Sequence, residues 1–117
     1  MIRISHEQLQ AFIAAGDKNL TIRIQDYLES EVVDLVGDVP ASERHRFIES
    51  AIKAGREAGI ETDIGLTWFT MLTFLMGPGF DQNPEIAAYL STEGVDKDDL
   101  LDDLFNAIVD EAEKETE

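Results

Sequence analysis

The side chains that could carry out nucleophilic or acid–base catalysis are few in this chain of 117 residues. Cysteine is absent, and the only imidazoles are those of His6 and His45. His6 falls in the first turn of a predicted helix, and His45 stands between two arginines on the predicted outer face of another. A serine nucleophile needs an adjacent base and a sharp turn that exposes its hydroxyl group. No such motif surrounds any serine of the chain: Ser5, Ser30, Ser42, Ser50 or Ser91. We therefore expect no catalytic residue and no enzymatic activity.

Two short segments contain oxygen ligands that a metal ion could use. Asp96-Lys97-Asp98-Asp99 begins like a calcium loop, but it lacks the glycine and the closing glutamate, and Leu100 occupies a ligand position. Asp81-Gln82-Asn83 also offers oxygen atoms, although Asn83 is better suited to cap the helix that follows. The absence of cysteine excludes a thiolate site. We expect no metal site and no cofactor.

The segment Gly77-Pro78-Gly79 could in principle be a phosphate-binding loop. Such a loop follows a strand, precedes a helix N-terminus and usually carries a lysine. Here the glycines follow a predicted apolar helix, no lysine is near, and Asp81 would repel a phosphate. We interpret the segment as the stop signal of a buried helix.

Charge is the most unusual property of the composition. Twenty-five acidic residues stand against nine basic ones, for a formal net charge of −16. Direct binding to nucleic acid or to an anionic membrane surface is disfavoured, because both are themselves negative. The charge favours either a protein partner with a basic surface or simple solubility.

The last predicted helix, about residues 97–113, concentrates this charge on one face. Like charges four residues apart cost about 0.2–0.5 kcal/mol per pair, so local stability does not explain the pattern. Either solubility or a basic partner does. The candidate partner-binding residues are Asp98, Asp99, Asp102, Asp103, Asp110 and Glu111.

An earlier predicted helix carries positive charge, on Arg44, Arg46, Lys53 and Arg56. We expect these to pair with acids of neighbouring helices; the alternative is a charged docking surface.

Helical spacing of apolar residues predicts an all-α protein, a compact bundle of about five helices. The first is a long helix over about 6–36, closed by Gly37, in which Gly16-Asp17 permits a break and 20–25 alternates like a strand. The others are expected from Asp38 or Ser42 to a C-cap at Gly59, over 63–76, over 84–90 and over 97–113. The helix at 63–76 is apolar on nearly every side, which predicts that it lies at the centre.

The length predicts one domain, residues 1–113, with an acidic and frayed tail at 114–117. The N-terminal residues contain no apolar segment of the kind that a signal peptide needs. The longest apolar stretch, 64–76, is shorter than the roughly 20 residues that span a bilayer. We expect a cytoplasmic protein with no membrane segment.

Several structural motifs resemble a family of small helical proteins encoded beside type VI secretion effectors of the VgrG and PAAR classes. The matching residues are the opening MIRIS-EQL, Ala58-Gly59-Ile60 with Glu61-Thr62-Asp63, Met71-Leu72, Gly77, Phe80-Asp81, Pro84 and Leu90. The family often has a tryptophan before the end of the short helix, where this chain has Ala87-Ala88-Tyr89. The resemblance implies a role near a secreted toxin, as an immunity protein, an adaptor or a chaperone.

We therefore expect a non-enzymatic, acidic binding protein that acts on a toxin or a secretion component, as an immunity protein that blocks its effector. An adaptor or chaperone is the first alternative, and it would hold an apolar effector segment in a groove near Trp68, Phe74 or Phe80. The second alternative is an inhibitor that mimics the charge of DNA.

Overall fold

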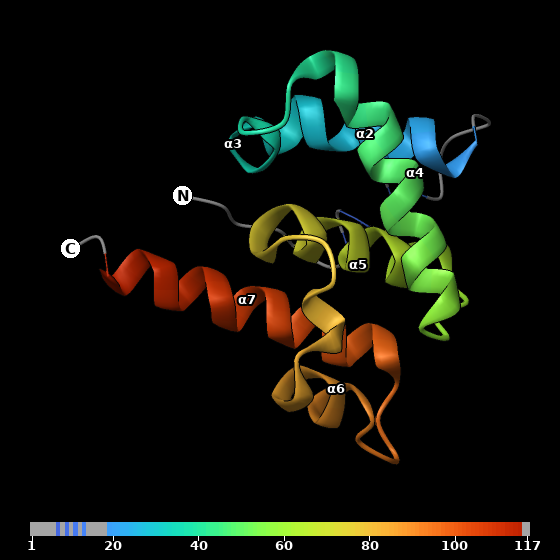
Figure 1. Ribbon diagram of the computed structural model, residues 1–117, viewed down its shortest axis with the longest axis vertical. Coiled ribbons are helices and arrows are strands. Elements are labelled where there is room, and N and C mark those ends of the chain that lie inside the picture. The colour runs from blue at the N-terminus through green and yellow to red at the C-terminus, as the bar shows by residue number, and fades with distance from the viewer. Residues whose placement is uncertain (1–6, 8, 10, 12, 14–18, 116–117) are drawn as a thin grey trace.

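All regular elements in the described part of the chain are helices (Figure 1). The computed structural model describes residues 7, 9, 11, 13 and 19–115. Residues 7, 9, 11 and 13 are helical. The elements that follow are α2 (Leu20–Glu31), α3 (Val33–Val36), α4 (Ala41–Glu57), α5 (Asp63–Met76), the 3-10 turn η1 (Phe80–Gln82), α6 (Pro84–Leu90) and α7 (Lys97–Glu115). The predicted all-α class is confirmed. The radius of gyration is 13.5 Å, the value expected for a compact domain of this length.

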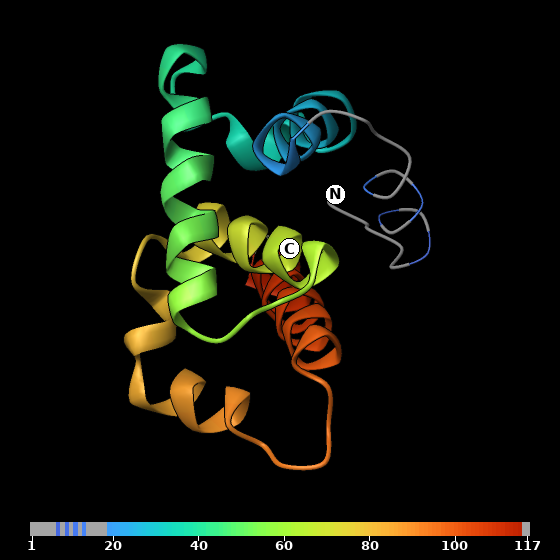
Figure 2. The same ribbon diagram turned by 90° about the vertical axis from the view of Figure 1, so that its right-hand side faces the viewer.

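Helix α5 is the centre of the molecule, as its composition predicts. Residues 65–73 are all buried, and α5 packs against α3, α4 and α7. In both overall views α5 lies between α2 and α3 on one side and α6 on the other (Figures 1 and 2).

Three buried threonines of α5 need hydrogen-bond partners inside the core. Each hydroxyl group donates to the carbonyl oxygen four residues earlier: Thr67 to Asp63, Thr70 to Leu66 and Thr73 to Phe69.

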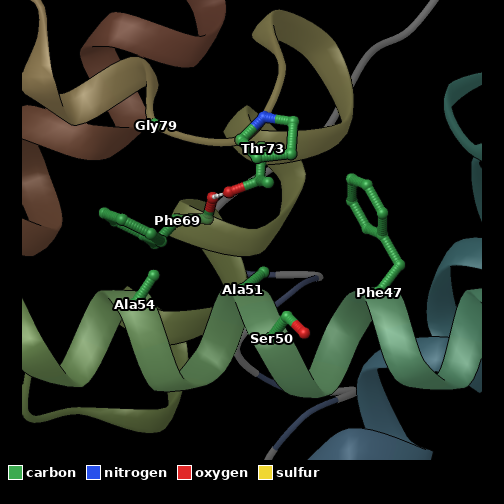
Figure 3. Close-up of a pocket in the computed structure, with 8 residues that line it drawn as sticks. Phe47, Ser50, Ala51, Ala54, Phe69, Thr73 and Gly79 are labelled. Atoms are coloured by element: carbon green, nitrogen blue, oxygen red, sulfur yellow. Dashed lines mark hydrogen bonds between the residues drawn. The ribbon is translucent and has the colours of Figure 1, made fainter.

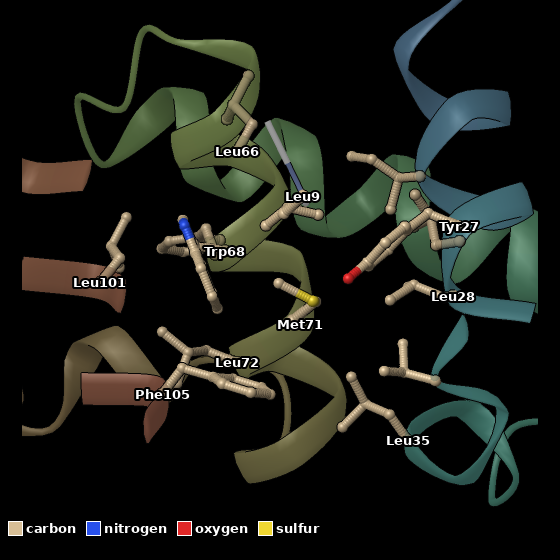
Figure 4. Packing of buried hydrophobic residues seen from close by; sticks show 14 of the residues in the cluster. Leu9, Tyr27, Leu28, Leu35, Leu66, Trp68, Met71, Leu72, Leu101 and Phe105 are labelled. Carbon is tan, nitrogen blue, oxygen red and sulfur yellow. The ribbon is translucent and has the colours of Figure 1, made fainter. Parts of the chain in front are cut away.

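The core has two sides, which meet at α5 (Figure 4). On one side the α2 residues Tyr27 and Leu28 pack toward Met71. On the other, Trp68 packs against Phe105 of α7 with ring centroids 5.4 Å apart. Aromatic pairs at this separation add to the stabilisation that burial provides. Helix α7 is therefore held to α5 along its apolar face.

The predicted long helix over 6–36 is wrong. Asn19 has an extended backbone (φ −64°, ψ 163°), and its side chain accepts a hydrogen bond from the N–H of Ile22, so it begins α2. Val32 (φ −137°, ψ 49°) then separates α2 from α3. The segment 20–25, whose apolar residues alternate, is helical. Gly16 and Asp17, where the sequence permits a break, lie outside the described residues.

Three predicted caps are confirmed, whereas α4 begins at Ala41 after Pro40 with no side-chain cap, and not at Asp38 or Ser42. Gly59 has a φ of 93°, its N–H donates to the carbonyl of Arg56, and the N–H of Ile60 donates to that of Gly55. This pair of bonds is a Schellman motif, which closes α4. Thr62 and Asn83 accept backbone N–H bonds at the starts of α5 and α6.

The end of the chain differs slightly from expectation, because α7 runs to Glu115 and not to residue 113. Residues 116–117 lie outside the described part. No helix among the described residues is long and apolar enough to cross a membrane.

Candidate functional site

The orientation of α7 determines which of its carboxylates reach solvent. Leu100, Leu101, Phe105 and Val109 are buried. Because these residues face the core, the opposite side of α7 faces water. Of the six candidate partner-binding residues, four are exposed: Asp99, Asp103, Asp110 and Glu111. We refer to these four residues as the α7 acidic face.

The α7 acidic face presents its charge in a fixed geometry. Asp99 and Asp103 are four residues apart, which places their carboxylates about 6 Å apart along the helix axis. Asp99, Asp103 and Glu111 form no ion pair with a basic side chain that the structure describes. Their charge is therefore directed at solvent or at a partner.

Asp98 has a different environment from the α7 acidic face. It is half-buried, and the Thr62 hydroxyl group donates a 2.6 Å hydrogen bond to its Oδ2. The adjacent Lys97 donates from Nζ to the carbonyl oxygen of Ala58 at 3.2 Å. These two contacts join the start of α7 to the turn between α4 and α5. Asp98 therefore has a structural role at this junction, and its role in partner binding stays a prediction.

Asp102 is also half-buried and is engaged within its own helix. The Asn106 side chain donates from Nδ2 to Asp102 Oδ1 at 2.7 Å and to the Asp102 carbonyl oxygen at 3.0 Å. Helical spacing alone groups Asp102 with the exposed carboxylates, because Asp102 directly precedes Asp103 in the helix. In the structure it lies at the edge of the α7 acidic face.

The electrostatic field of the α7 acidic face acts on Tyr89, at the end of the neighbouring helix α6. The Tyr89 pKa is raised, first by partial desolvation and then by the charge of Asp103. A carboxylate opposes the formation of a tyrosinate close to it.

The basic residues of α4 divide into two kinds. Arg44 is half-buried and donates to Glu29 Oε2 at 3.0 Å and to the Val39 carbonyl oxygen at 2.9 Å. The expected internal pairing is confirmed for this residue. Arg46, Lys53 and Arg56 are exposed and pair with no carboxylate of the described residues. For them the alternative, a charged docking surface, stays open.

The predicted outer position of His45 is confirmed. Its Nε2 lies 3.2 Å from Glu49 Oε1, and its Nδ1 lies 3.3 Å from Gln25 Oε1. Neither ring nitrogen is hydrogen-bonded to a serine. The geometry at His45 is therefore that of a surface side chain between two helices.

An apolar pocket lies between α4 and the loop that follows α5, and the sequence did not predict it (Figure 3). Its volume is about 80 Å³, and residues lining it include Phe47, Ala51, Ala54, Phe69, Thr73 and Gly79. The wall at its loop side is Pro78-Gly79, part of the segment that the sequence suggests is a helix stop. Small side chains on α4 opposite a glycine-rich loop are the signal that could have revealed it.

The three aromatic residues expected near a groove occupy different positions relative to this pocket. Trp68 is fully buried and points toward α7. Phe74 and Phe80 support the lining from behind, with ring centroids 4.4 Å from Phe47 and 4.9 Å from Phe69. Phe47 and Phe69 are the rings that line the pocket itself.

Within residues 7, 9, 11, 13 and 19–115, no group of three or more histidines or carboxylates is arranged to hold a metal ion. No protein-family model, curated protein or solved structure matches this chain.

Proposed function

We propose that this chain is a non-enzymatic, acidic binding protein that covers a basic surface of a protein partner with the α7 acidic face. The observation that carries the proposal is the position of Asp99, Asp103 and Glu111, which are exposed and unpaired among described side chains on a helix fixed to the core. A rigid row of carboxylates loses little conformational freedom when a partner docks. Charge complementarity of this kind supplies fast association and specificity.

The partner that this surface fits best is a secreted toxin or secretion effector with a basic active-site cleft. The chain would then be an immunity protein, which blocks its effector in the bacterial cytoplasm. The resemblance of the turns at Ala58-Gly59-Ile60 and Phe80-Asp81 to proteins encoded beside type VI effectors supports this assignment. An acidic inhibitor of a nucleic-acid-cleaving effector would compete with the negatively charged substrate for the same cleft.

A second candidate function is that of an adaptor or chaperone for such an effector. The apolar pocket between α4 and Pro78-Gly79 favours it, because an adaptor recognises an apolar segment of its cargo. The two functions differ in their dependence on salt. Recognition through carboxylates weakens as salt screens charge, whereas recognition through an apolar pocket does not.

The decisive measurement is the association rate, at several ionic strengths, with any effector found to be encoded beside the gene of this chain. The triple variant Asp99→Lys, Asp103→Lys and Asp110→Lys should associate at least about tenfold more slowly and lose most of the salt dependence. The matched control is Glu31→Lys, Asp34→Lys and Asp38→Lys, which changes the net charge equally at exposed residues of α2, α3 and the turn after α3.

The control variant should keep most of the wild-type rate, because its substitutions lie away from the α7 acidic face. If both variants slow association equally, only net charge matters and α7 is not the docking surface. If neither variant changes the rate, the immunity proposal fails and the adaptor function is favoured.

A further inference from the structure

An exposed aromatic ring lies beside the α7 acidic face. Among the described residues, the large apolar side chains that stay exposed are Val33, Met76, Tyr89 and Val95. Tyr89 is the aromatic member of this group, with 37% of its surface exposed. Tyrosine is one of the residue types that most often dominate the binding energy of protein interfaces. Tyr89 is therefore a candidate anchor for a partner.

The position of Tyr89 is set by the packing of α6. Ile86 and Leu90 pack against the core, and α6 contacts α7. Tyr89 follows Ile86 by three residues and directly precedes Leu90, so helical spacing places it at the edge of this packed face. The charge of Asp103 acts on the Tyr89 hydroxyl group across the two helices. The ring and the carboxylate therefore belong to one surface, at the boundary between α6 and α7 (Figure 1).

Carboxylates flank the Tyr89 ring on both helices. Glu85 precedes Tyr89 by four residues, so it lies one turn away on the same side of α6. Glu85 and Asp103 are both exposed, and neither forms an ion pair with a basic side chain that the structure describes. Lys97, the basic residue closest to Asp103 in the sequence, directs its Nζ to the Ala58 carbonyl oxygen. The carboxylates beside the ring are thus available to a cation from outside the chain.

Arginine is the basic side chain that can use an aromatic ring and a carboxylate together. Its planar guanidinium group stacks on the face of a tyrosine, and the N–H groups at its edge donate to nearby carboxylates. A lysine ammonium group is compact and strongly hydrated, and it has no plane that could stack. A surface that combines Tyr89 with Asp103 therefore distinguishes two side chains of the same charge.

We propose that Tyr89, Glu85 and Asp103 form the binding site for one arginine side chain of the protein partner. The guanidinium group lies on the Tyr89 ring and donates hydrogen bonds to the carboxylates beside it. The inference rests on the function proposed for the α7 acidic face and deepens it, because it specifies an arginine where that function requires only a basic surface. It also extends the contact surface from α7 to α6.

The test uses the full-length, isotope-labelled protein and two synthetic peptides in nuclear magnetic resonance titrations at low ionic strength. The peptides are acetyl-Gly-Gly-Arg-Gly-Gly-amide and its counterpart with lysine, which carry the same charge. The arginine peptide should shift the backbone amides of Tyr89 and Asp103 and bind about two- to fivefold more tightly, the range expected for stacking on an exposed ring. Its δ protons should move upfield, because the ring current of an aromatic face shields protons stacked on it.

Two substitutions at Tyr89 separate stacking from charge and from apolar contact. Tyr89→Phe keeps an aromatic face and should keep the preference for arginine. Tyr89→Leu keeps an apolar side chain without that face and should bind both peptides equally. Asp103→Asn should weaken both peptides, whereas Asp38→Asn, which removes an exposed carboxylate after α3, should leave the shifts at Tyr89 unchanged. Circular dichroism of each variant establishes that the fold is intact.

The proposal is overturned if wild-type protein binds the two peptides equally, or if Tyr89→Leu retains the preference for arginine. It is also overturned if the arginine peptide shifts no amide of α6 or α7.

Measurements with the effector separate this inference from the function on which it rests. If the peptides show the arginine preference but the triple lysine variant keeps the wild-type association rate, the arginine site stands and the immunity proposal fails. If the triple variant slows association but Tyr89→Leu leaves the affinity for the effector unchanged, the immunity proposal stands and the arginine site is excluded.

Discussion

Thr62 and Asp98 lie 36 residues apart in the chain, yet their side chains are joined by a 2.6 Å hydrogen bond. The same Thr62 oxygen accepts the backbone N–H of Gly65 at 3.0 Å and so caps α5. One hydroxyl group thus begins the central helix and also holds the first turn of α7 against it. The geometry of the α7 acidic face depends on this junction, because it fixes where α7 starts.

Removal of this hydroxyl group should lower stability more than loss of an ordinary cap. Thr62→Ala removes both the N-cap and the charge-assisted bond to Asp98, and we expect the free energy of unfolding to fall by about 2 kcal/mol. Thr62→Ser keeps an oxygen at the same place and should retain most of that free energy. Urea denaturation of the three proteins measures the differences.

The neighbouring carboxylates provide the control for this prediction. Asp98→Ala should destabilise the protein, whereas Asp99→Ala, at an exposed residue of the same turn, should change stability much less. In the double variant Thr62→Ala with Asp98→Ala, the two effects should be less than additive, because both remove the same bond. Strict additivity would mean that the bond contributes no free energy in solution.

Gly65 leaves no room for a side chain at this junction. A Cβ atom there would collide with Asp98 Oδ1 and lie 2.8 Å from both the Ile60 side chain and the Thr62 Oγ1. Gly65→Ala should therefore displace the Thr62–Asp98 bond and cost about 1–3 kcal/mol, despite the better helix propensity of alanine. Thermal unfolding followed by circular dichroism measures this change.

Gly37 is the matched control for Gly65. Its backbone is right-handed helical (φ −60°, ψ −28°), and the nearest atoms to an added Cβ are 3.7 Å away. Gly37→Ala should leave stability unchanged or raise it by about 0.4–1 kcal/mol, because the unfolded chain loses freedom. A decrease at Gly37 as large as that at Gly65 would show that glycine is required at both positions for reasons other than packing.

Three helix ends could be predicted from the sequence because their signals are local. Thr62, Asn83 and Gly59 each act on backbone groups within a few residues, so residue type and position suffice. The break at Val32 could not be predicted in this way. The apolar spacing continues from α2 into α3 because both segments face the same core, so the pattern resembles that of one long helix.

The α7 acidic face and the apolar pocket also show how far local sequence patterns can predict a structure. Helical spacing predicts an acidic side of α7, since a buried face implies an exposed one, but it does not separate the four exposed carboxylates from the half-buried Asp98 and Asp102. The structural role of Asp98 depends on a residue 36 positions away, and the pocket depends on how Phe47 and Phe69 pack between helices. Such contacts are set by tertiary packing, which spacing within a single helix does not encode.

Repulsion among the carboxylates of α7 should lower the free energy of unfolding. Whether a single carboxylate stabilises or destabilises the protein depends on its position in its helix. Asp103 follows Asp99 by four residues and lies beyond the first turn, so Asp103→Asn removes repulsion. We expect it to raise the free energy of unfolding by about 0.2–0.5 kcal/mol at low ionic strength. Denaturation in urea at low and high salt measures the effect, which should shrink as salt screens the charges.

Glu85 provides the opposite case, because it lies in the first turn of α6, where a negative charge is favourable. Glu85→Gln should lower stability by about 0.3–1 kcal/mol at low salt, although it removes the same charge as Asp103→Asn. If both substitutions stabilise the protein equally, the effect comes from net charge and not from the position of each carboxylate.

The two tyrosines of the chain should make stability fall at high pH. Burial and the charge of Glu31 raise the pKa of Tyr27, and partial desolvation and Asp103 raise that of Tyr89. Both groups therefore lose their protons in the unfolded chain near the ordinary value of about 10, before they lose them in the folded protein. Their contribution to stability is fully present below a pH of about 10 and is lost as pH rises above that value.

Tyrosinate absorbance should accordingly show higher midpoints in the folded protein than in urea. Tyr27→Phe should reduce the loss of melting temperature above that pH, and Asp103→Asn should lower the Tyr89 midpoint in the folded protein. Equal midpoints in the folded and unfolded states would contradict the burial of Tyr27 and the field of Asp103 together.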